Sequence, residues 1–189
     1  MSMSLRGILL VTVLCLSASS ALADTGLWQK LHEPGHFAIM RHATAPGTGD
    51  PDNFRIGDCS TQRNLNDTGR AEARAVGQSA KNAGIKSARV YSSQWCRCLE
   101  TARNLGLGAV QELPALNSFY QRAADRDPNL AALKAFIEAN ADKPGPVFLV
   151  THQVTISALT RRYTRQGEVI VFRHAGNGEV DVVGSIPPG

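Results

Sequence analysis

Short strand-like runs alternate with longer helix-like segments along this sequence, and that alternation limits its fold more than any other feature. Runs rich in β-branched or aromatic residues and bounded by Gly or Pro predict buried strands at residues 36–40, 88–92 and 146–150. Apolar or small residues recur at helical spacing between and after them. The alternation predicts an α/β fold, a three-layer α/β/α sandwich whose mostly parallel sheet carries helices on both faces.

The helical segments have recognisable ends. They are expected over about 66–84, over 94–105 with a stop at Gly106, over 129–139 after Asp127-Pro128, and directly after His152. Asn66 or Asp67 is suited to cap the first helix, because a short polar side chain accepts a bond from a free amide of the first turn. Gly84 is a common stop.

The rest of the chain consists of one long loop and a C-terminal hairpin. Residues 169–174 and 179–185 flank a Gly-Asn-Gly turn, which predicts an antiparallel hairpin and therefore a mixed sheet. Residues 43–64 have three glycines, two prolines and little periodicity. A loop this long is more often functional than decorative. Residues 24–189 contain no repeat or linker and are expected to form a single domain.

The N-terminus has the pattern of a secretory signal peptide. Arg6 precedes an apolar stretch and then small residues, which predicts cleavage after residue 23. The apolar run of residues 8–16 is far shorter than the roughly 20 residues of a membrane-spanning helix, so no stable membrane insertion is expected after cleavage. Cys15 leaves a lipoprotein open as an alternative, although Leu14 stands where a small residue normally precedes the cysteine. The protein is expected to be periplasmic or secreted.

Charge and cysteine content restrict the partners. The net charge is +4 with no dense Lys/Arg run, which suits a small anionic substrate and argues against nucleic-acid binding. Three cysteines follow the predicted cleavage point, and export favours one disulfide, of Cys59 with Cys96 or Cys98. The C-x-C spacing has no second pair nearby and fits zinc poorly, so no metal is expected.

Cationic and imidazole side chains fall where strands end. Arg41 and His42 close the first strand and His152 follows a later one, whereas Arg97 lies about one turn into the helix after residues 88–92. Ligands of open α/β sheets bind at the carboxyl ends of the strands. The four side chains are therefore expected at one rim. The remaining histidines of the mature chain lack such support and are expected to be structural or at the surface: His32, His36 and His174.

These residues and their order resemble the histidine phosphatase superfamily, also called the phosphoglycerate mutase-like family. Its motifs are similar to Arg41-His42-Ala43, with Ala in place of the usual Gly of R-H-G, to Leu65–Gly69 for L-x-x-x-G, to Ser93–Ala102 for S-x-x-x-R-x-x-x-T-A, and to Val147–His152 for the late strand and its histidine. The resemblance runs from about residue 36 to residue 183, and it looks closest to periplasmic lipopolysaccharide core heptose phosphate phosphatases.

The resemblance implies an enzyme, a phosphoric monoester hydrolase that works without a cofactor. His42 would attack phosphorus and become phosphohistidine, and Arg41 and Arg97 would hold the phosphoryl oxygens. His152 would complete this grip, with Gln153 beside the substrate. The chemistry fits, because a neutral imidazole is a competent nucleophile and two neighbouring cations disfavour its protonation. A guanidinium also binds phosphoryl oxygens in a bidentate way.

One family feature is missing, the glutamate that protonates the leaving group. Asn117 and Ser118 stand in its place, so Glu112 and Asp125 are the remaining candidates for the proton donor. Without a dedicated acid, the enzyme would favour good leaving groups, such as those of phosphoramidates or anomeric sugar phosphates, or would use water as the proton donor. Gln153 replaces a small residue and would narrow the pocket.

The expected function is an exported phosphatase for phosphomonoesters, sugar phosphates among them, acting on a small phosphorylated substrate. Phosphohistidine phosphatases, which also lack the acid, are one alternative, and a periplasmic phosphate-binding or partner-binding module without turnover is another. A cysteine-dependent phosphatase is disfavoured, because no cysteine has an arginine after five intervening residues. A serine hydrolase is disfavoured as well, because no G-x-S-x-G elbow occurs.

Overall fold

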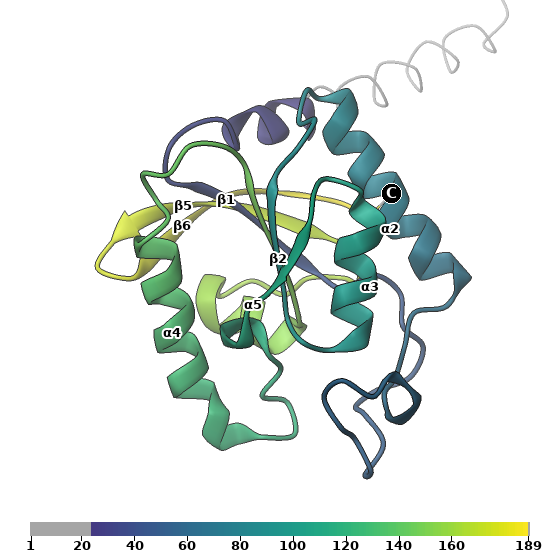
Figure 1. The fold of residues 1–189 in the computed structure, drawn as a ribbon. Coiled ribbons are helices and arrows are strands. Elements are labelled where there is room, and N and C mark those ends of the chain that lie inside the picture. The colour runs from purple at the N-terminus through teal and green to yellow at the C-terminus, as the bar shows by residue number, and fades with distance from the viewer. Residues whose placement is uncertain (1–23, 189) are drawn as a thin grey trace, which may run out of the picture.

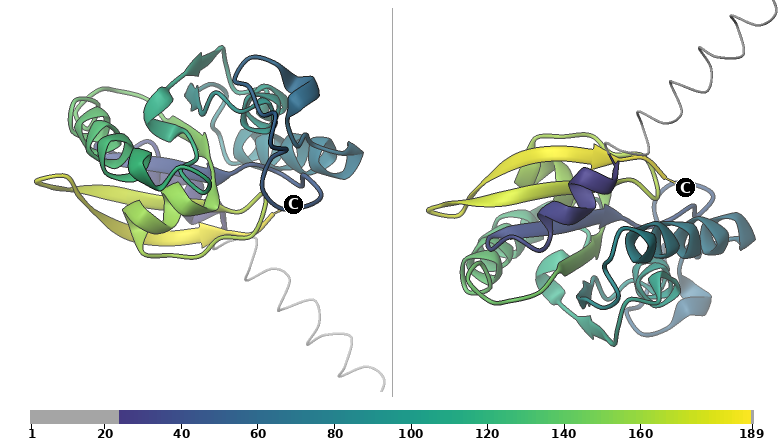
Figure 2. Two further views of the ribbon diagram at one scale, coloured as in Figure 1. Left: turned by 90° about the horizontal axis from the view of Figure 1, so that it is seen from below. Right: turned by 90° about the horizontal axis from the view of Figure 1, so that it is seen from above.

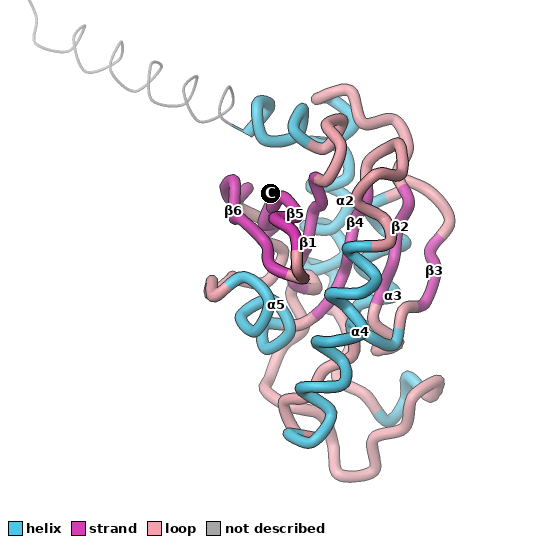
Figure 3. Tube along the Cα trace, turned by 90° about the vertical axis from the view of Figure 1, so that its left-hand side faces the viewer, coloured by secondary structure: helices cyan, strands magenta, loops and turns pink. Residues whose placement is uncertain are grey.

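A six-stranded sheet forms the centre of the computed structural model, which describes residues 24–188 (Figure 1). The strands are β1 (His36–Arg41), β2 (Arg89–Ser92), β3 (Val110–Glu112), β4 (Val147–Thr151), β5 (Val169–Gly176) and β6 (Glu179–Ile186). They follow the order β3-β2-β4-β1-β5-β6 across the sheet (Figure 3). The first four are mutually parallel, and β5 and β6 are antiparallel to their neighbours. The predicted signal peptide lies outside the described residues.

Helices cover both faces of this sheet, which confirms the expected α/β fold with its mostly parallel, mixed sheet. The helices α2 (Asp67–Asn82) and α3 (Cys96–Leu105) lie on one side, and α4 (Arg126–Glu138) and α5 (Gln153–Thr160) lie on the other (Figure 1). The views from below and above show the β5–β6 hairpin, in yellow, along one edge (Figure 2). Within residues 24–188, none of the helices has the length and apolar character needed to cross a bilayer.

The alternation along β1 explains how one strand serves two layers. Ala38 and Met40 belong to a core cluster with the side chains of α2 and α3, whereas Phe37 and Ile39 belong to a second cluster with those of α4 and α5. Successive side chains of a strand point to opposite faces, so an uninterrupted apolar run is what a strand buried on both faces requires.

The helix ends agree with the capping residues, with two differences at helix starts. Asn66 caps α2, since its side chain accepts from the amide of Gly69 at 2.8 Å. Helix α3 ends at Gly106, which has a left-handed φ of 62°, but begins at residue 96 rather than 94. Helix α4 begins three residues earlier than expected, at Arg126. Pro128 then lies in the first turn of α4, where a residue without an amide hydrogen is tolerated because the first amides have no partner within the helix.

Two glycines set the position of α2 against the rest of the molecule. A Cβ on Gly69 would lie 2.1 Å from the carbonyl oxygen of Thr44, and one on Gly77 would lie 1.9 Å from that of Leu105. Any larger residue would push the helix away. The helix is thereby held close to the segment that follows β1, which begins with His42, and to the end of α3, the helix that carries Arg97.

Candidate active site

The four side chains expected at one rim line a single cavity of about 330 Å³. Backbone hydrogen bonds hold the three chain segments together where the strands end: the amide of His42 donates to the carbonyl of Thr151, and the amide of Ser93 donates to that of Val150, both at 2.9 Å. The cavity therefore lies at the carboxyl ends of the parallel strands. The structure brings Arg41, His42, Arg97 and His152 together there.

His42 presents one nitrogen that is not engaged with its own backbone. Its side chain is buried, and Nδ1 lies 2.9 Å from the carbonyl oxygen of Ala43. A carbonyl only accepts, so Nδ1 carries the proton and Nε2 keeps its lone pair. Burial and the charges of Arg97, Arg63 and Arg41 hold the pKa of this imidazole well below its usual value of 6.5. The ring is therefore neutral near pH 7.

His152 lies beside His42, with the two ring centroids 5.6 Å apart. Its Nε2 is 2.9 Å from the hydroxyl of Ser93 and 3.4 Å from the sulfur of Cys98. Burial and the charge of Arg97 lower the pKa of His152 well below 6.5 as well. The second imidazole is thus a neutral polar group fixed by residues that precede and begin α3.

The two predicted arginines are anchored differently. Arg41 donates from Nη1 to the carbonyl of Thr164 at 3.0 Å. Arg97 is buried and forms an ion pair with Asp50, with Nη1 and Oδ1 2.7 Å apart. In both, Nε is buried and has no hydrogen-bond partner among the described residues. Such donors are rare in folded proteins and call for a partner.

Two charged residues of the cavity were missed by the sequence analysis, Asp50 and Arg63. Arg63 donates from Nε to the carbonyl of Gly49 at 2.9 Å and from Nη1 to that of Ala45. Burial and the charge of Arg97 lower its pKa. Both residues lie in the loop of residues 43–64, whose length was the only signal that pointed to them.

The two candidate proton donors lie outside the set of residues that line the cavity. Glu112 is exposed on the edge strand β3 and accepts from Nε2 of Gln94 at 3.1 Å, whereas Asp125 ends a short 3-10 helix at residues 123–125. The structure therefore does not bring either residue to the site. Asp50 is the one carboxylate in the lining among the described residues. Burial raises its pKa, but bonds from Arg97, Arg63 and Trp95 outweigh this and lower it, so Asp50 is ionised at neutral pH.

Gln153 lines the cavity, but its amide is already engaged with protein groups. Its oxygen accepts from the amide and the hydroxyl of Thr164 at 2.9 and 2.8 Å, and its nitrogen donates to Ser157 at 2.7 Å. Gln153 thus braces the segment whose carbonyl holds Arg41. Of the residues that replace the missing glutamate, Ser118 lines the cavity, while the Asn117 side chain caps the Gln94 amide at 2.9 Å.

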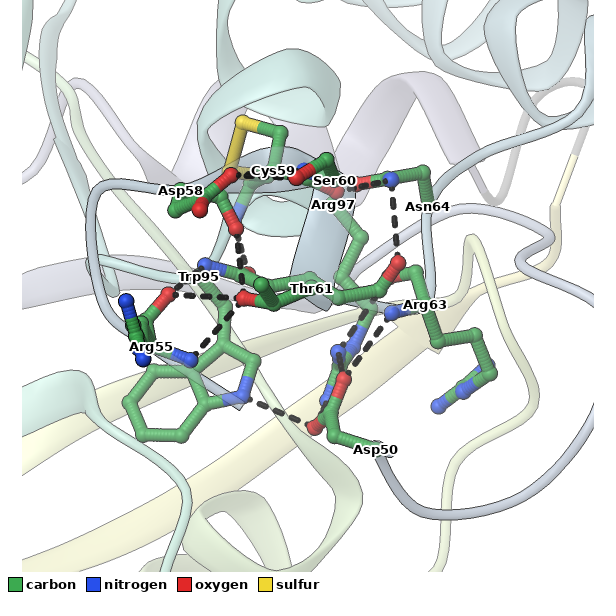
Figure 4. Close-up of a disulfide and its surroundings, with 12 residues drawn as sticks. Asp50, Arg55, Asp58, Cys59, Ser60, Thr61, Arg63, Asn64, Trp95 and Arg97 are labelled. Atoms are coloured by element: carbon green, nitrogen blue, oxygen red, sulfur yellow. Dashed lines mark hydrogen bonds and ion pairs between the residues drawn. A yellow bond between two sulfur atoms is a disulfide. The ribbon is translucent and has the colours of Figure 1, made fainter. Parts of the chain in front are cut away.

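A disulfide joins Cys59 to Cys96 and connects the long loop to the first residue of α3 (Figure 4). Of the two pairings left open by the sequence, the structure has this one and leaves Cys98 as a buried free thiol. Burial raises the pKa of Cys98 to about 12, so it is not a thiolate near pH 7 and lacks the form in which cysteine is a nucleophile. The bridge lies next to Arg97 in the sequence.

The other histidines contact groups away from the cavity. Nε2 of His174 is 2.7 Å from a carboxylate oxygen of Glu138, and Nδ1 of His36 is 3.2 Å from the carbonyl of Pro34. His32 is exposed. Within residues 24–188, no three His, Cys, Asp or Glu side chains are grouped as metal ligands.

Part of the sequence matches a family model. Residues 37–120 match the histidine phosphatase superfamily (branch 1), a range that includes Arg41, His42 and Arg97. No curated protein matches the chain in sequence. The resemblance to heptose phosphate phosphatases is thus not supported by a curated relative.

Solved structures of phosphatases share the fold. The protein histidine phosphatase SixA complexed with tungstate is similar with a TM-score of 0.61 and 17% identity, over 81% of this chain and 97% of that chain. The putative phosphohistidine phosphatase SixA from Agrobacterium tumefaciens is similar with a TM-score of 0.58 and 18% identity, over 82% of this chain and 99% of that chain. A phosphoserine phosphatase mutant from Entamoeba histolytica in complex with phosphoserine is similar with a TM-score of 0.55 and 14% identity, over 79% of this chain and 95% of that chain. The family match supports a phosphatase enzyme, and the solved structures, all below 25% identity, show the shared fold.

Proposed function

Because residues 37–120 match the histidine phosphatase superfamily, we propose that this chain is an exported phosphatase that hydrolyses phosphomonoesters through a phosphohistidine on His42. The observation that carries the proposal is the state of the His42 ring. It is neutral, its Nδ1 is held by the Ala43 carbonyl, and its Nε2 is left for a reaction in a cavity lined by arginines. Sugar phosphates are included among the proposed substrates.

The proposed reaction has two steps. Nε2 of His42 attacks phosphorus, the P–N bond forms, the P–O bond to the leaving group breaks, and the leaving oxygen takes a proton from water. The bond from Nδ1 to the Ala43 carbonyl stabilises the positive ring of the phosphohistidine. Water then attacks phosphorus and the P–N bond breaks, so that His42 returns to its neutral form and dihydrogen phosphate leaves. The hydroxide formed in the first step takes up one proton of this phosphate. Arg41 and Arg97 supply fixed positive charge to the phosphoryl oxygens during both steps.

The lining of the cavity favours substrates with good leaving groups. Its one described carboxylate, Asp50, is ionised and paired with Arg97, so it has no proton to give at neutral pH. A phosphoramidate such as phosphohistidine does not depend on a strong acid in the way an alkyl ester does. This observation supports a phosphohistidine phosphatase as the second candidate function.

Export is part of the proposal, with the periplasm or the extracellular space as the location. The Cys59–Cys96 disulfide supports it, because such bonds persist in oxidising compartments and are rare in the cytosol. The predicted signal peptide of residues 1–23 points the same way.

The test is hydrolysis of p-nitrophenyl phosphate by the protein without residues 1–23. We expect His42→Ala to lower turnover by about 10⁴-fold or more, since the nucleophile is lost. Wild-type protein mixed with substrate and quenched in alkali should carry phosphate on His42. A protein that binds phosphate with no turnover that depends on His42 would instead be the binding module. A panel of phosphorylated sugars, lipopolysaccharide fragments and phosphohistidine peptides then separates the substrate classes.

A further inference from the structure

Both carboxylate oxygens of Asp50, a residue that lines the cavity, accept hydrogen bonds from protein groups. Its Oδ1 accepts from Nη1 of Arg97 at 2.7 Å and from the amide of Arg63 at 3.1 Å. Its Oδ2 accepts from Nη2 of Arg97 at 3.1 Å and from the indole of Trp95 at 3.0 Å (Figure 4). A carboxylate has about four acceptor positions, so all of them are filled. The side chains of Asp50 and Arg97 are only 7% and 4% exposed.

This arrangement determines which hydrogens of Arg97 remain free. Nη1 uses its two hydrogens on Asp50 and on the carbonyl of Arg63, at 2.7 and 3.3 Å. Nη2 uses one on Asp50 at 3.1 Å and keeps one, and Nε has no partner among the described residues. The free hydrogens of Nε and Nη2 lie on the same edge of the planar guanidinium. That edge is a two-donor fork, the shape that binds two oxygens of a phosphoryl group.

We propose that Asp50 is the positioning residue of this site, which holds the end of the Arg97 guanidinium so that its Nε–Nη2 edge is kept for two oxygens of a tetrahedral oxyanion. The inference rests on the proposed function and adds a residue that does not itself touch the substrate. The guanidinium of Arg41 is also held at one nitrogen, since Nη1 donates to the carbonyl of Thr164 while Nε has no partner among the described residues.

The alternative is that Asp50 occupies the place of the substrate and is displaced when phosphate binds. The contacts argue against displacement, because Asp50 would lose the bonds from Arg63 and Trp95 in addition to those from Arg97. Its backbone is also held, since its amide donates to Oε1 of Gln121 at 3.0 Å. The disulfide connects the same loop to the residue before Arg97.

Removal of the Asp50 charge separates the positioning role from the alternative, because the two predict opposite changes in phosphate affinity. A negative charge beside an anion site weakens anion binding through Coulomb repulsion, so its removal alone would tighten binding. A positioning role predicts weaker binding after the same change, because Arg97 loses the group that orients it. Asp50→Asn keeps the size of the side chain, removes the charge, and leaves only one oxygen to accept from Arg97.

The experiment is titration calorimetry of inorganic phosphate, the product of the proposed reaction, into wild type, Asp50→Asn and Asp52→Asn. Asp52 is exposed and lies outside the cavity lining, so its variant is a control for the lost charge alone. We expect Asp50→Asn to bind phosphate about tenfold more weakly or worse, and Asp52→Asn to stay within about twofold of wild type. Equal or tighter binding by Asp50→Asn would overturn the inference.

A second variant decides the matter if Asp50→Asn does not fold. The Trp95 ring packs against Phe54 and His152, with centroids 4.8 and 5.2 Å away; Trp95→Phe keeps a smaller aromatic ring there and removes the indole donor to Asp50. We expect phosphate binding to weaken by about two- to fivefold, and unchanged or tighter binding would count against the inference. The assay needs no turnover, so an inactive wild type would remove the proposed function without touching the role of Asp50. An active wild type, together with variants that bind phosphate as tightly as wild type, would overturn the role of Asp50 and leave the proposed function in place.

Discussion

At the scale of single residues, the chemistry depends on keeping the His42 ring neutral inside a positive cavity. Burial disfavours the charged imidazolium, and Arg97, Arg63 and Arg41 repel it further. The same cations attract a phosphoryl dianion. In the proposed reaction, the cations that would bind the substrate therefore also keep the His42 ring neutral, and no separate base is needed to deprotonate it.

The pH dependence of turnover tests this point. The pKa of His42 is lowered well below 6.5, so the ring gains its inactivating proton only at more acidic pH. We expect the acidic limb of kcat/KM for p-nitrophenyl phosphate, corrected for titration of the substrate, to have its midpoint below pH 6.5. A midpoint at or above 6.5 would show that the cavity does not hold the ring neutral.

The site residues divide by how their position is encoded. Arg41, His42 and His152 were predictable, because an apolar run locates a strand and parallel strands end at one edge of the sheet. Asp50 and Arg63 were not, because the loop of residues 43–64 has no period and its path is set by contacts with distant groups. The ion pair of Asp50 with Arg97 spans 47 positions of sequence.

At the scale of elements, the long loop is fixed to α3 next to Arg97, the residue proposed to bind the anion. The Cys59–Cys96 bridge closes a segment with a sequence separation of 37. The side chain of Gln62 adds a second link, since its oxygen accepts from the amide of Cys96 at 2.9 Å. The loop and the start of α3 therefore behave as one unit, although no regular structure connects them.

Removal of this bridge should lower the stability of the protein. For a closed segment of this length the chain-entropy model gives about 4 kcal/mol, so we expect Cys59→Ser/Cys96→Ser to lose roughly 3–4 kcal/mol in urea unfolding. Dithiothreitol should lower the wild-type midpoint and leave that of the double variant unchanged. A wild-type midpoint that does not respond to dithiothreitol would contradict this. Thiol titration of the denatured, unreduced chain of residues 24–189 should find one free cysteine.

Sequence patterns located most elements and missed those that are too short to show one. The apolar runs and caps predicted β1, β2, β4, the hairpin and the helices. Strand β3 has three residues, Val110–Glu112, and is held by pairing with β2 rather than by a pattern of its own. Helix α4 starts early because it directly follows a 3-10 helix at residues 123–125, and no residue type in that segment predicts this 3-10 helix.

At the scale of the whole molecule, the site lies where the two core layers meet the end of the sheet. His42 and His152 follow β1 and β4, strands that contribute side chains to both core clusters. Both rings are buried, and burial is the largest cause of their lowered pKa values. The lowered pKa of both imidazoles thus depends on the folded structure that buries them.

The stability of the fold should consequently fall in mild acid. Below pH 6.5 the unfolded chain binds more protons on His42 and His152 than the folded chain does, so the free energy of unfolding decreases as the pH falls. One pH unit below 6.5, the expected loss is at most about 1.4 kcal/mol for each ring. Urea unfolding between pH 7.5 and pH 5 measures it. This window lies above that of the carboxylates whose pKa is lowered, such as Asp50, whose contribution is lost only below 3.8.

The matched variant is His42→Asn/His152→Asn, which keeps polar side chains of similar reach but removes both titrating rings. We expect it to be less stable than wild type at pH 7.5, because buried hydrogen bonds change, yet to lose up to about 3 kcal/mol less than wild type over the drop to pH 5.5. Parallel pH dependence in the two proteins would show that the imidazoles take up protons in the folded state. The neutral His42 ring on which the proposed reaction depends would then not be present at that pH.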